Sequence, residues 1–276
     1  MSLADDHQRL TLAAVSDSIP SVELAEAEYQ SCRAGHGPED PVTLNAQMRL
    51  ARAYYEVGQY GRAEDLYSSV FAMRGRLVGL DDPSTLSSAF GLAGAFMKSK
   101  AWTSARPVLE DLLERSDRVH GSDSDMSRRI AINLANTYRE LGRFGDELPL
   151  RQRILAQTRQ TPDSDPEGEA RSLVDLAKAF LHLGNHELAL SVSRDALAAQ
   201  EESGASFREI VLTKWRIAGE LVSLKRPDEA SAMFEQVLRG VEQLEQDDPL
   251  RRRARKQRRS YSLLARLSGR GKITAP

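Results

Sequence analysis

The residues that could do chemistry in this sequence are few and poorly grouped. His182 and His186 are four positions apart, a spacing that could place two imidazoles on one metal ion. Gly184 lies between them at a predicted turn, and no third ligand is in view, which favours two ordinary surface histidines. Cys32 would need a positioned base to act as a nucleophile, and His36 merely follows it in a predicted loop.

Other short motifs do not supply a site either. Asp-rich links such as Asp81-Asp82 could mimic a calcium loop, but the 12-residue ligand spacing is absent. Helix capping by side-chain oxygens is the better interpretation of these carboxylates. The sequence contains neither GxGxxG nor GxxxxGK[ST], and a single cysteine excludes a zinc-type cysteine pair. We therefore predict no catalytic residues, no metal, no cofactor and no enzymatic activity.

The densest charge is the run RRRARKQRR near the C-terminus. Residues 250–276 hold ten Lys/Arg and no Asp/Glu, whereas the other 249 hold 28 basic and 40 acidic residues, a net of −12. The run could be a solvated helix face, an internal clasp on the acidic body, or a surface for nucleic acid, since clustered cations displace counterions from phosphate. Only Tyr261 is nearby to stack on a base, which weakens a single-strand interpretation. The candidate anion-binding residues are Arg251, Arg252, Arg253, Arg255, Lys256, Arg258 and Arg259.

The elements that would position these residues repeat every 42 residues, with a step of 41 residues to the last full copy. Asp40-Pro41 recurs as Asp82-Pro83, and a hairpin turn recurs at Gly58, Lys100, Gly142, Gly184 and Lys225. A pair of Leu or Ile with Ala recurs before each turn, with a larger apolar residue on the same helical face. The pairs are Leu50-Ala51, Leu92-Ala93, Leu134-Ala135, Leu176-Ala177 and Ile217-Ala218. This period predicts helical hairpins that stack because none can bury its apolar face alone.

The pattern resembles the tetratricopeptide repeat, in the long variety found in kinesin light chains and many bacterial proteins. The resemblance rests on the 42-residue spacing, the Asp-Pro opening, the segment AEDLY, and Pro107 and Pro149 near the start of a second helix. It covers roughly residues 41–248. The sequence departs from the usual pattern at Lys100 and Lys225, where Gly is expected, and at Glu147, where a small residue is expected. The resemblance implies an all-α right-handed superhelix, and we expect about eleven to thirteen helices.

The expected organisation is a row of hairpins with a cap at each end. Residues 1–39 form a degenerate capping hairpin with helices at 3–15 and 22–34, since terminal repeats are atypical. Five hairpins follow within 40–248, at about 41–79, 83–120, 125–160, 166–203 and 207–246. Residues 249–268 form a basic capping helix, and residues 269–276 form a flexible tail.

In proteins of this family the first helices line a concave surface that binds partners. A stripe beside the core positions of these helices contains five basic residues and no acid in twenty positions. Arginine matches carboxylates and asparagine can bracket a peptide unit, so the stripe predicts a groove for an extended or helical peptide of acidic character. The alternative is that these are solvent-facing arginines and packed apolar side chains. The candidate partner-binding residues are Asn45, Met48, Arg52, Phe90, Arg129, Asn136, Arg139, Arg171, Lys178 and Trp215.

The functional prediction is a non-enzymatic scaffold or adaptor that binds a protein or peptide. A regulator that couples partner binding to nucleic-acid contact through the basic end, and an accessory subunit of an enzyme complex, stay open as alternatives. No apolar run approaches about 18 residues, and the N-terminus lacks a secretory pattern. A single cysteine fits a reducing compartment, so we expect a cytoplasmic location without membrane insertion. An apolar end left uncovered by a weak cap would favour a homodimer.

Overall fold

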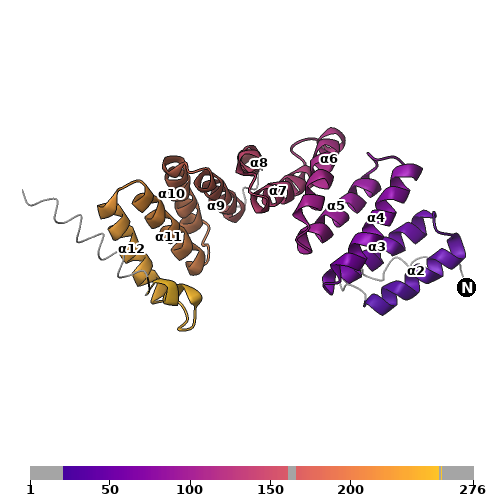
Figure 1. The fold of residues 1–276 in the computed structure, drawn as a ribbon, viewed down its shortest axis with the longest axis horizontal. Coiled ribbons are helices and arrows are strands. Elements are labelled where there is room, and N and C mark those ends of the chain that lie inside the picture. The colour runs from indigo at the N-terminus through magenta and orange to yellow at the C-terminus, as the bar shows by residue number, and fades with distance from the viewer. Residues whose placement is uncertain (1–20, 161–165, 255, 257–276) are drawn as a thin grey trace, which may run out of the picture. The chain divides into compact units, whose positions relative to one another are not determined.

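The computed structural model describes residues 21–160, 166–254 and 256 of the 276-residue chain. Every regular element in this part of the chain is an α-helix, from α2 to α12 and a further helical segment after it (Figure 1). The chain divides into two compact units, residues 1–130 and 131–276, with the boundary inside one helix. The predicted all-α architecture of stacked helical hairpins is confirmed.

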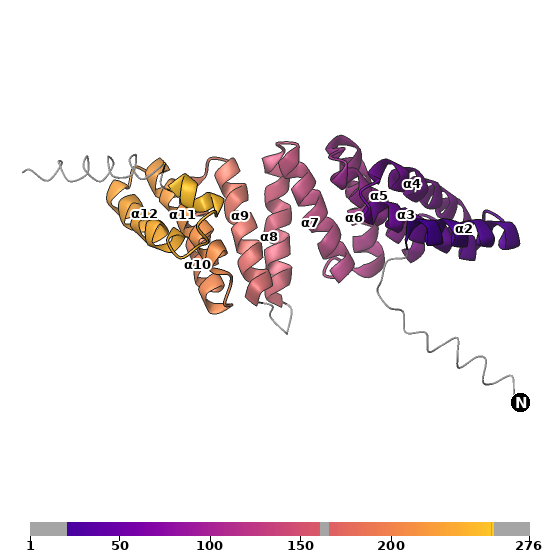
Figure 2. The same cartoon turned by 90° about the horizontal axis from the view of Figure 1, so that it is seen from below.

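Consecutive helices within each unit run in alternating directions and pack on one another (Figure 2). The first unit contains α2 (Val22–His36), α3 (Pro41–Glu56), α4 (Tyr60–Leu77), α5 (Pro83–Lys98), α6 (Trp102–His120) and the start of α7 (Asp125–Glu140). The second unit contains the rest of α7, then α8 (Phe144–Gln160), α9 (Pro166–His182), α10 (His186–Glu202), α11 (Phe207–Ser223) and α12 (Pro227–Val241). Residues 249–254 and 256 are also helical.

Several expected segments lie outside the described residues. These are the predicted helix at 3–15, residues 257–268 of the predicted C-terminal helix, and the predicted tail at 269–276.

The Asp-Pro signature marks helix starts. The carboxylates of Asp40 and Asp82 each accept a hydrogen bond from the backbone N–H two residues on, at 2.8 Å. The proline that follows each aspartate occupies the first turn, where its missing N–H costs little. Asp248 accepts a 2.7 Å bond from the Leu250 N–H in the same way, so the signature also begins the C-terminal helical segment.

The five hairpin turns share one backbone geometry. In each, a residue with positive φ follows the first helix, and the next N–H bonds to the carbonyl five residues back, as in a Schellman motif. Glycine supplies the left-handed conformation at three of the turns. Lys100 (φ 62°) and Lys225 (φ 56°) adopt it at the other two, so the departures from glycine leave the turn unchanged.

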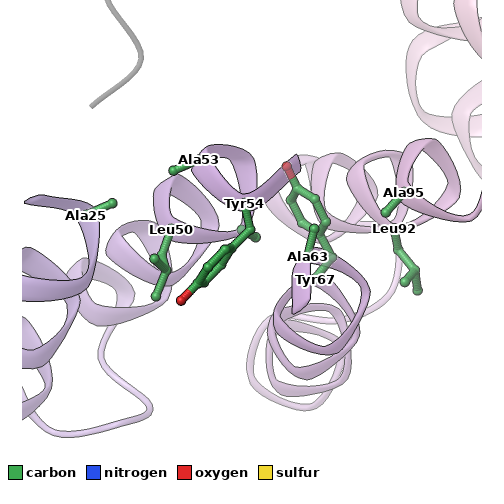
Figure 3. Close-up of a cluster of buried hydrophobic side chains, with 9 residues drawn as sticks. Ala25, Leu50, Ala53, Tyr54, Ala63, Tyr67, Leu92 and Ala95 are labelled. Carbon is green, nitrogen blue, oxygen red and sulfur yellow. The ribbon is translucent and has the colours of Figure 1, made fainter. Parts of the chain in front are cut away.

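The core of the first unit is built from four successive helices (Figure 3). Ala25 of α2, Leu50 and Tyr54 of α3, and Tyr67 of α4 are buried together, and α5 adds further side chains. A Cβ built on Gly91 of α5 would lie 2.5 Å from the Tyr67 ring, so the two helices approach closely at this point. Gly91 therefore allows the first two hairpins to approach closely at this point.

Candidate functional site

A cavity of about 600 Å³ lies between α9 and α11 in the second unit. These are the first helices of two successive hairpins, the position where a groove was predicted. Cavities of this size accommodate small ligands or a few peptide residues. Arg171, Val174 and Lys178 line it from α9, Leu212, Trp215 and Arg216 from α11, and Arg253 from the C-terminal helical segment.

The cavity joins three of the predicted partner-binding residues, Arg171, Lys178 and Trp215, with one residue of the basic run, Arg253. Trp215 is only 9% exposed, so most of its ring belongs to the core. Its indole meets Phe234 edge-on, with centroids 5.8 Å apart, and the Arg253 guanidinium lies 5.1 Å from its ring centroid. Trp215 is thus a packed part of the cavity wall, and little of its ring is exposed for contact with a ligand.

The cations on α9 already have acidic neighbours. Arg171 pairs with Glu167 at 2.6 Å, and Lys178 pairs with Asp175 at 2.9 Å. Burial opposes ionisation of Asp175, but the charges of Lys178 and Arg151 more than compensate, so the pKa of this carboxyl lies below its ordinary value. Asp175 is therefore a fixed negative charge in the cavity wall.

Arg216 is different, and the stripe drawn on the sequence missed it. Its Nη1 is buried and has no hydrogen-bond partner, and no ion pair or other hydrogen bond reaches this guanidinium within the described residues. Burial lowers the pKa of Arg216, and the nearby charges of Glu220 and Asp175 partly offset this effect. An arginine remains a cation at neutral pH after such a shift, so the cavity wall contains a half-buried cation whose Nη1 has no hydrogen-bond partner.

A buried ion pair lies beside the cavity. Glu147, at the position where the other hairpins have alanine, is fully buried, and its carboxylate accepts a 3.0 Å bond from Arg151 Nε. Arg151 also donates to Asn136 Oδ1 at 2.7 Å and to Asp175 Oδ2 at 3.3 Å. The buried charge of Glu147, which departs from the repeat pattern, is thus compensated by Arg151 four residues later on the same helix.

Two predicted groove asparagines are held by buried arginines of second helices. In the first unit Arg74 donates to Asn45 Oδ1 at 2.7 Å and also to the Ser84 carbonyl and Ser88 Oγ. In the second unit Arg151 donates to Asn136. Because each amide oxygen accepts from an arginine, the side-chain N–H groups are the edge left for a ligand. These asparagines are therefore positioned to donate to a carbonyl or carboxylate.

The other predicted groove residues are less engaged. In the first unit Arg52 is exposed, Met48 packs against the core, and the Arg129 guanidinium lies 5.1 Å from the centroid of the Phe90 ring. In the second unit Arg139 is half-buried, 3.9 Å from Glu140.

The basic run is partly used inside the protein. Arg251 and Arg252 donate to backbone carbonyls of the preceding loop, at 3.2 and 3.4 Å. Arg253 covers Trp215, and Lys256 is exposed. Arg255, Arg258 and Arg259 lie outside the described residues. The described arginines therefore do not form an uncommitted cationic face.

Residues 21–160, 166–254 and 256 contain no cluster of three or more His, Cys, Asp or Glu arranged for a metal ion. His182 ends α9 and stacks on Phe144 with ring centroids 4.5 Å apart, while His186 begins α10. Among the same residues no helix has both the length and the apolarity needed to cross a bilayer.

Comparison with known proteins agrees with the geometry. Residues 43–84 match the family model of the tetratricopeptide repeat. A structure described as a putative kinesin light chain with nearly identical TPR-like repeats, from Podosopora anserina, superimposes with a TM-score of 0.65. It is 23% identical and the match covers 76% of this chain and 100% of that one. Residues 43–84 thus match a tetratricopeptide repeat, and the chain has the fold of TPR-like repeat proteins.

Two further solved structures are also similar. BtubC (BKLC) from P. vanneervenii has a TM-score of 0.65 and 17% identity, over 83% of this chain and 92% of that one. YrrB, a TPR protein with an unusual peptide-binding site, has a TM-score of 0.58 and 16% identity, over 84% and 99%. At these identities the likeness shows the TPR fold alone. No curated protein sequence gives a significant match.

Proposed function

We propose that this TPR protein is a non-enzymatic interaction scaffold that binds an extended acidic segment of a partner protein along the first helices of its hairpins. The observation that carries the proposal is the cavity between α9 and α11, which brings together Arg171, Lys178 and Trp215. A groove between first helices is where the repeat architecture offers a continuous surface to an extended chain.

The internal ion pair on this surface can be replaced by an ion pair with a ligand. Arg171 and Glu167 are about two-thirds exposed, with side-chain accessibilities of 67% and 68%. Such exposed pairs contribute only about 0–1 kcal/mol, so a ligand carboxylate can replace the internal one at little cost. Val174 and Leu212 supply apolar surface beside the charges. The chemistry therefore suits a segment that mixes acidic and apolar side chains.

The proposal is tested by charge reversal in the cavity. Partner proteins captured by the intact chain are identified by mass spectrometry, and their affinities are measured for the wild type and for R171E/K178E. We expect the double variant to lose about tenfold or more in affinity, because two attractive charges become repulsive. The matched control is R194E/R239E, which reverses two exposed arginines on the second helices α10 and α12. Equal losses in both double variants would contradict the proposed surface.

Binding through the basic end, a role as an accessory subunit, a homodimeric state and a cytoplasmic location stay predictions. The described contacts of Arg251, Arg252 and Arg253 do not favour nucleic acid over a protein partner.

A further inference from the structure

We infer that the cavity between α9, α11 and the C-terminal helical segment is a binding subsite for a single carboxylate group, with Arg216 as its anchor. This inference rests on the proposed function, because it names the chemical group that the same surface would recognise. It adds two residues from outside the predicted stripe, Arg216 and Arg253.

The first step is the unsatisfied guanidinium. Buried polar groups in folded proteins are nearly always hydrogen-bonded, and an exception needs a physical explanation. Arg216 offers five N–H donors in a planar fork that fits both oxygens of a carboxylate. Since Nη1 is buried without a partner and the side chain lines the cavity, a ligand that enters could satisfy it.

The second step is that the neighbouring carboxylates do not serve Arg216. Asp175 accepts bonds from Lys178 and Arg151 instead. Glu220 is buried one turn along α11, and its Oε1 accepts a 2.9 Å bond from Ser193. Its Oε2 has no hydrogen-bond partner, and neither Glu220 oxygen lies within ion-pair distance of Arg216. The charges of Glu220 and Asp175 therefore act on the Arg216 guanidinium at a distance, without a hydrogen bond to it.

The third step is the contribution of the C-terminal helical segment. Arg253 comes from the helical segment after the last hairpin and lies over the indole of Trp215, within reach of the same cavity. The described residues give it no hydrogen bond or ion pair. Leu250 and Ala254 of this segment are buried against the α11–α12 core, which holds Arg253 in place. The helical segment at residues 249–254 thus completes the subsite.

The charge balance selects the ligand class. Four cations and three carboxylates line the cavity, which leaves one net positive charge. A monoanion balances this charge, whereas a phosphate dianion would leave the cavity with a net negative charge. Val174 and Leu212 line the same cavity and favour a carboxylate carried by an apolar body. The cations are Arg171, Lys178, Arg216 and Arg253, and the acids are Glu167, Asp175 and Glu209.

The protein contains its own reporter for this site. It has two tryptophans, Trp215 at the cavity and Trp102 in the first unit, so their indole N–H signals in a ¹H–¹⁵N NMR spectrum can be assigned with W102F. The probes are N-acetylphenylalanine, N-acetylphenylalanine amide and N-acetylglutamic acid α-amide. The first carries a terminal carboxylate, the second carries no carboxylate, and the third carries a side-chain carboxylate. Inorganic phosphate is the fourth probe.

We expect one or both carboxylate probes to shift the Trp215 signal at millimolar concentration, and the probe that binds tighter identifies a terminal or side-chain source. Trp102 should not respond. Equal shifts with the amide probe, tighter binding of phosphate, or no shift with either carboxylate would overturn the inference.

Variants then test the anchor. R216Q should weaken carboxylate binding at least tenfold and should not lower the unfolding temperature, because it removes a half-buried cation with an unsatisfied N–H group. R253Q should weaken binding several-fold, R216K tests the fork geometry, and the control R239Q should change neither property. Unchanged binding in folded R216Q, or in R216K if R216Q does not fold, would overturn the assignment. If R216Q still captures partners that R171E/K178E loses, the subsite is wrong while the proposed scaffold function stands.

Discussion

At the scale of single residues, the buried pair of Glu147 and Arg151 gives the sharpest contrast between hairpins. Alanine occupies the matching position in the other four hairpins and is fully buried in each, at Ala63, Ala105, Ala189 and Ala230. Restoring the repeat pattern with E147A should therefore leave Arg151 buried with only part of its charge compensated. We expect a loss of about 3 kcal/mol in the free energy of unfolding, because removing one member of a buried pair strands the other.

The control is the double variant E147A/R151M, which removes both charges. We expect it to recover most of the loss, measured by thermal and denaturant unfolding followed by circular dichroism. If E147A alone were as stable as the wild type, the pair would contribute nothing to this hairpin.

A second residue-scale prediction concerns Glu220. Burial raises the pKa of this carboxyl above its ordinary value of 4.5, although the Ser193 bond and the Arg216 charge act in the other direction. The folded state therefore binds the proton more tightly than the unfolded state does. The resulting stability is present below pH 4.5 and is lost as pH rises through the higher folded pKa.

Replacing Glu220 by Gln removes this titration and keeps an acceptor for Ser193. We expect the unfolding temperature of E220Q to exceed that of the wild type at pH 8, and the difference to shrink or reverse at pH 4. A difference that is constant from pH 4 to pH 8 would mean that the carboxyl does not titrate as its burial requires.

At the scale of elements, the hairpin turn is the unit that recurs most faithfully. The left-handed residue costs an ordinary side chain about 1–2 kcal/mol and costs glycine little. K100G should therefore stabilise its turn by about 0.5–1 kcal/mol, while G142A should destabilise its turn by about 1 kcal/mol. Gly142 has φ 70°, and a Cβ added to it would meet nothing within 4 Å, so G142A introduces backbone strain without a steric clash. Both effects are measured as shifts in the denaturant midpoint.

A matched control is G145A, in the first turn of α8, where an added Cβ meets nothing within 4 Å. Alanine favours a helix over glycine by up to about 1 kcal/mol in the interior, so this variant should be at least as stable as the wild type. Parallel losses in G142A and G145A would show that the turn conformation is not the cause.

At the scale of the whole molecule, sequence periodicity predicts the all-α architecture because each hairpin repeats the same local signals. Asp40 and Asp82 cap helices as their type suggests, and Leu50-Ala51 and its counterparts are buried. These signals are local, so a single sequence contains them in full. The left-handed Lys100 and Lys225 show that turn geometry persists even where the residue type is unfavourable.

The candidate site was only partly predictable. The helical stripe led to Arg171, Lys178 and Trp215, but it could not show that Trp215 is mostly core or that Arg216, one position later, faces the same cavity. Arg253 reaches the site only through packing of residues distant in sequence. One signal was available in the sequence, because Arg216 is a charged residue among the apolar residues of α11. Periodicity alone does not identify the charged residues that lie near it in the fold.

The described start of the basic C-terminal segment, residues 249–254, packs into the core of the second unit. Leu250 is 6% exposed and Ala254 is fully buried, in one cluster with Trp215 and Phe234. Removing residues 249–276 should therefore uncover this cluster and destabilise the second unit, in addition to removing charge. Any loss of binding in such a truncation would mix a folding defect with an electrostatic effect.

Charge and packing can be separated with substitutions that keep the buried residues. L250A should cost about 2–4 kcal/mol in unfolding free energy through the cavity that it leaves. R251Q/R252Q/K256Q keeps Leu250 and Ala254, and we expect it to retain the thermal stability of the wild type to within a few degrees. If the basic end binds nucleic acid, this triple variant should lose retention on immobilised DNA or RNA and flatten its salt dependence, because fewer counterions are released. Equal retention of the wild type and the folded triple variant, at every salt concentration, would assign these cations to packing and capping instead.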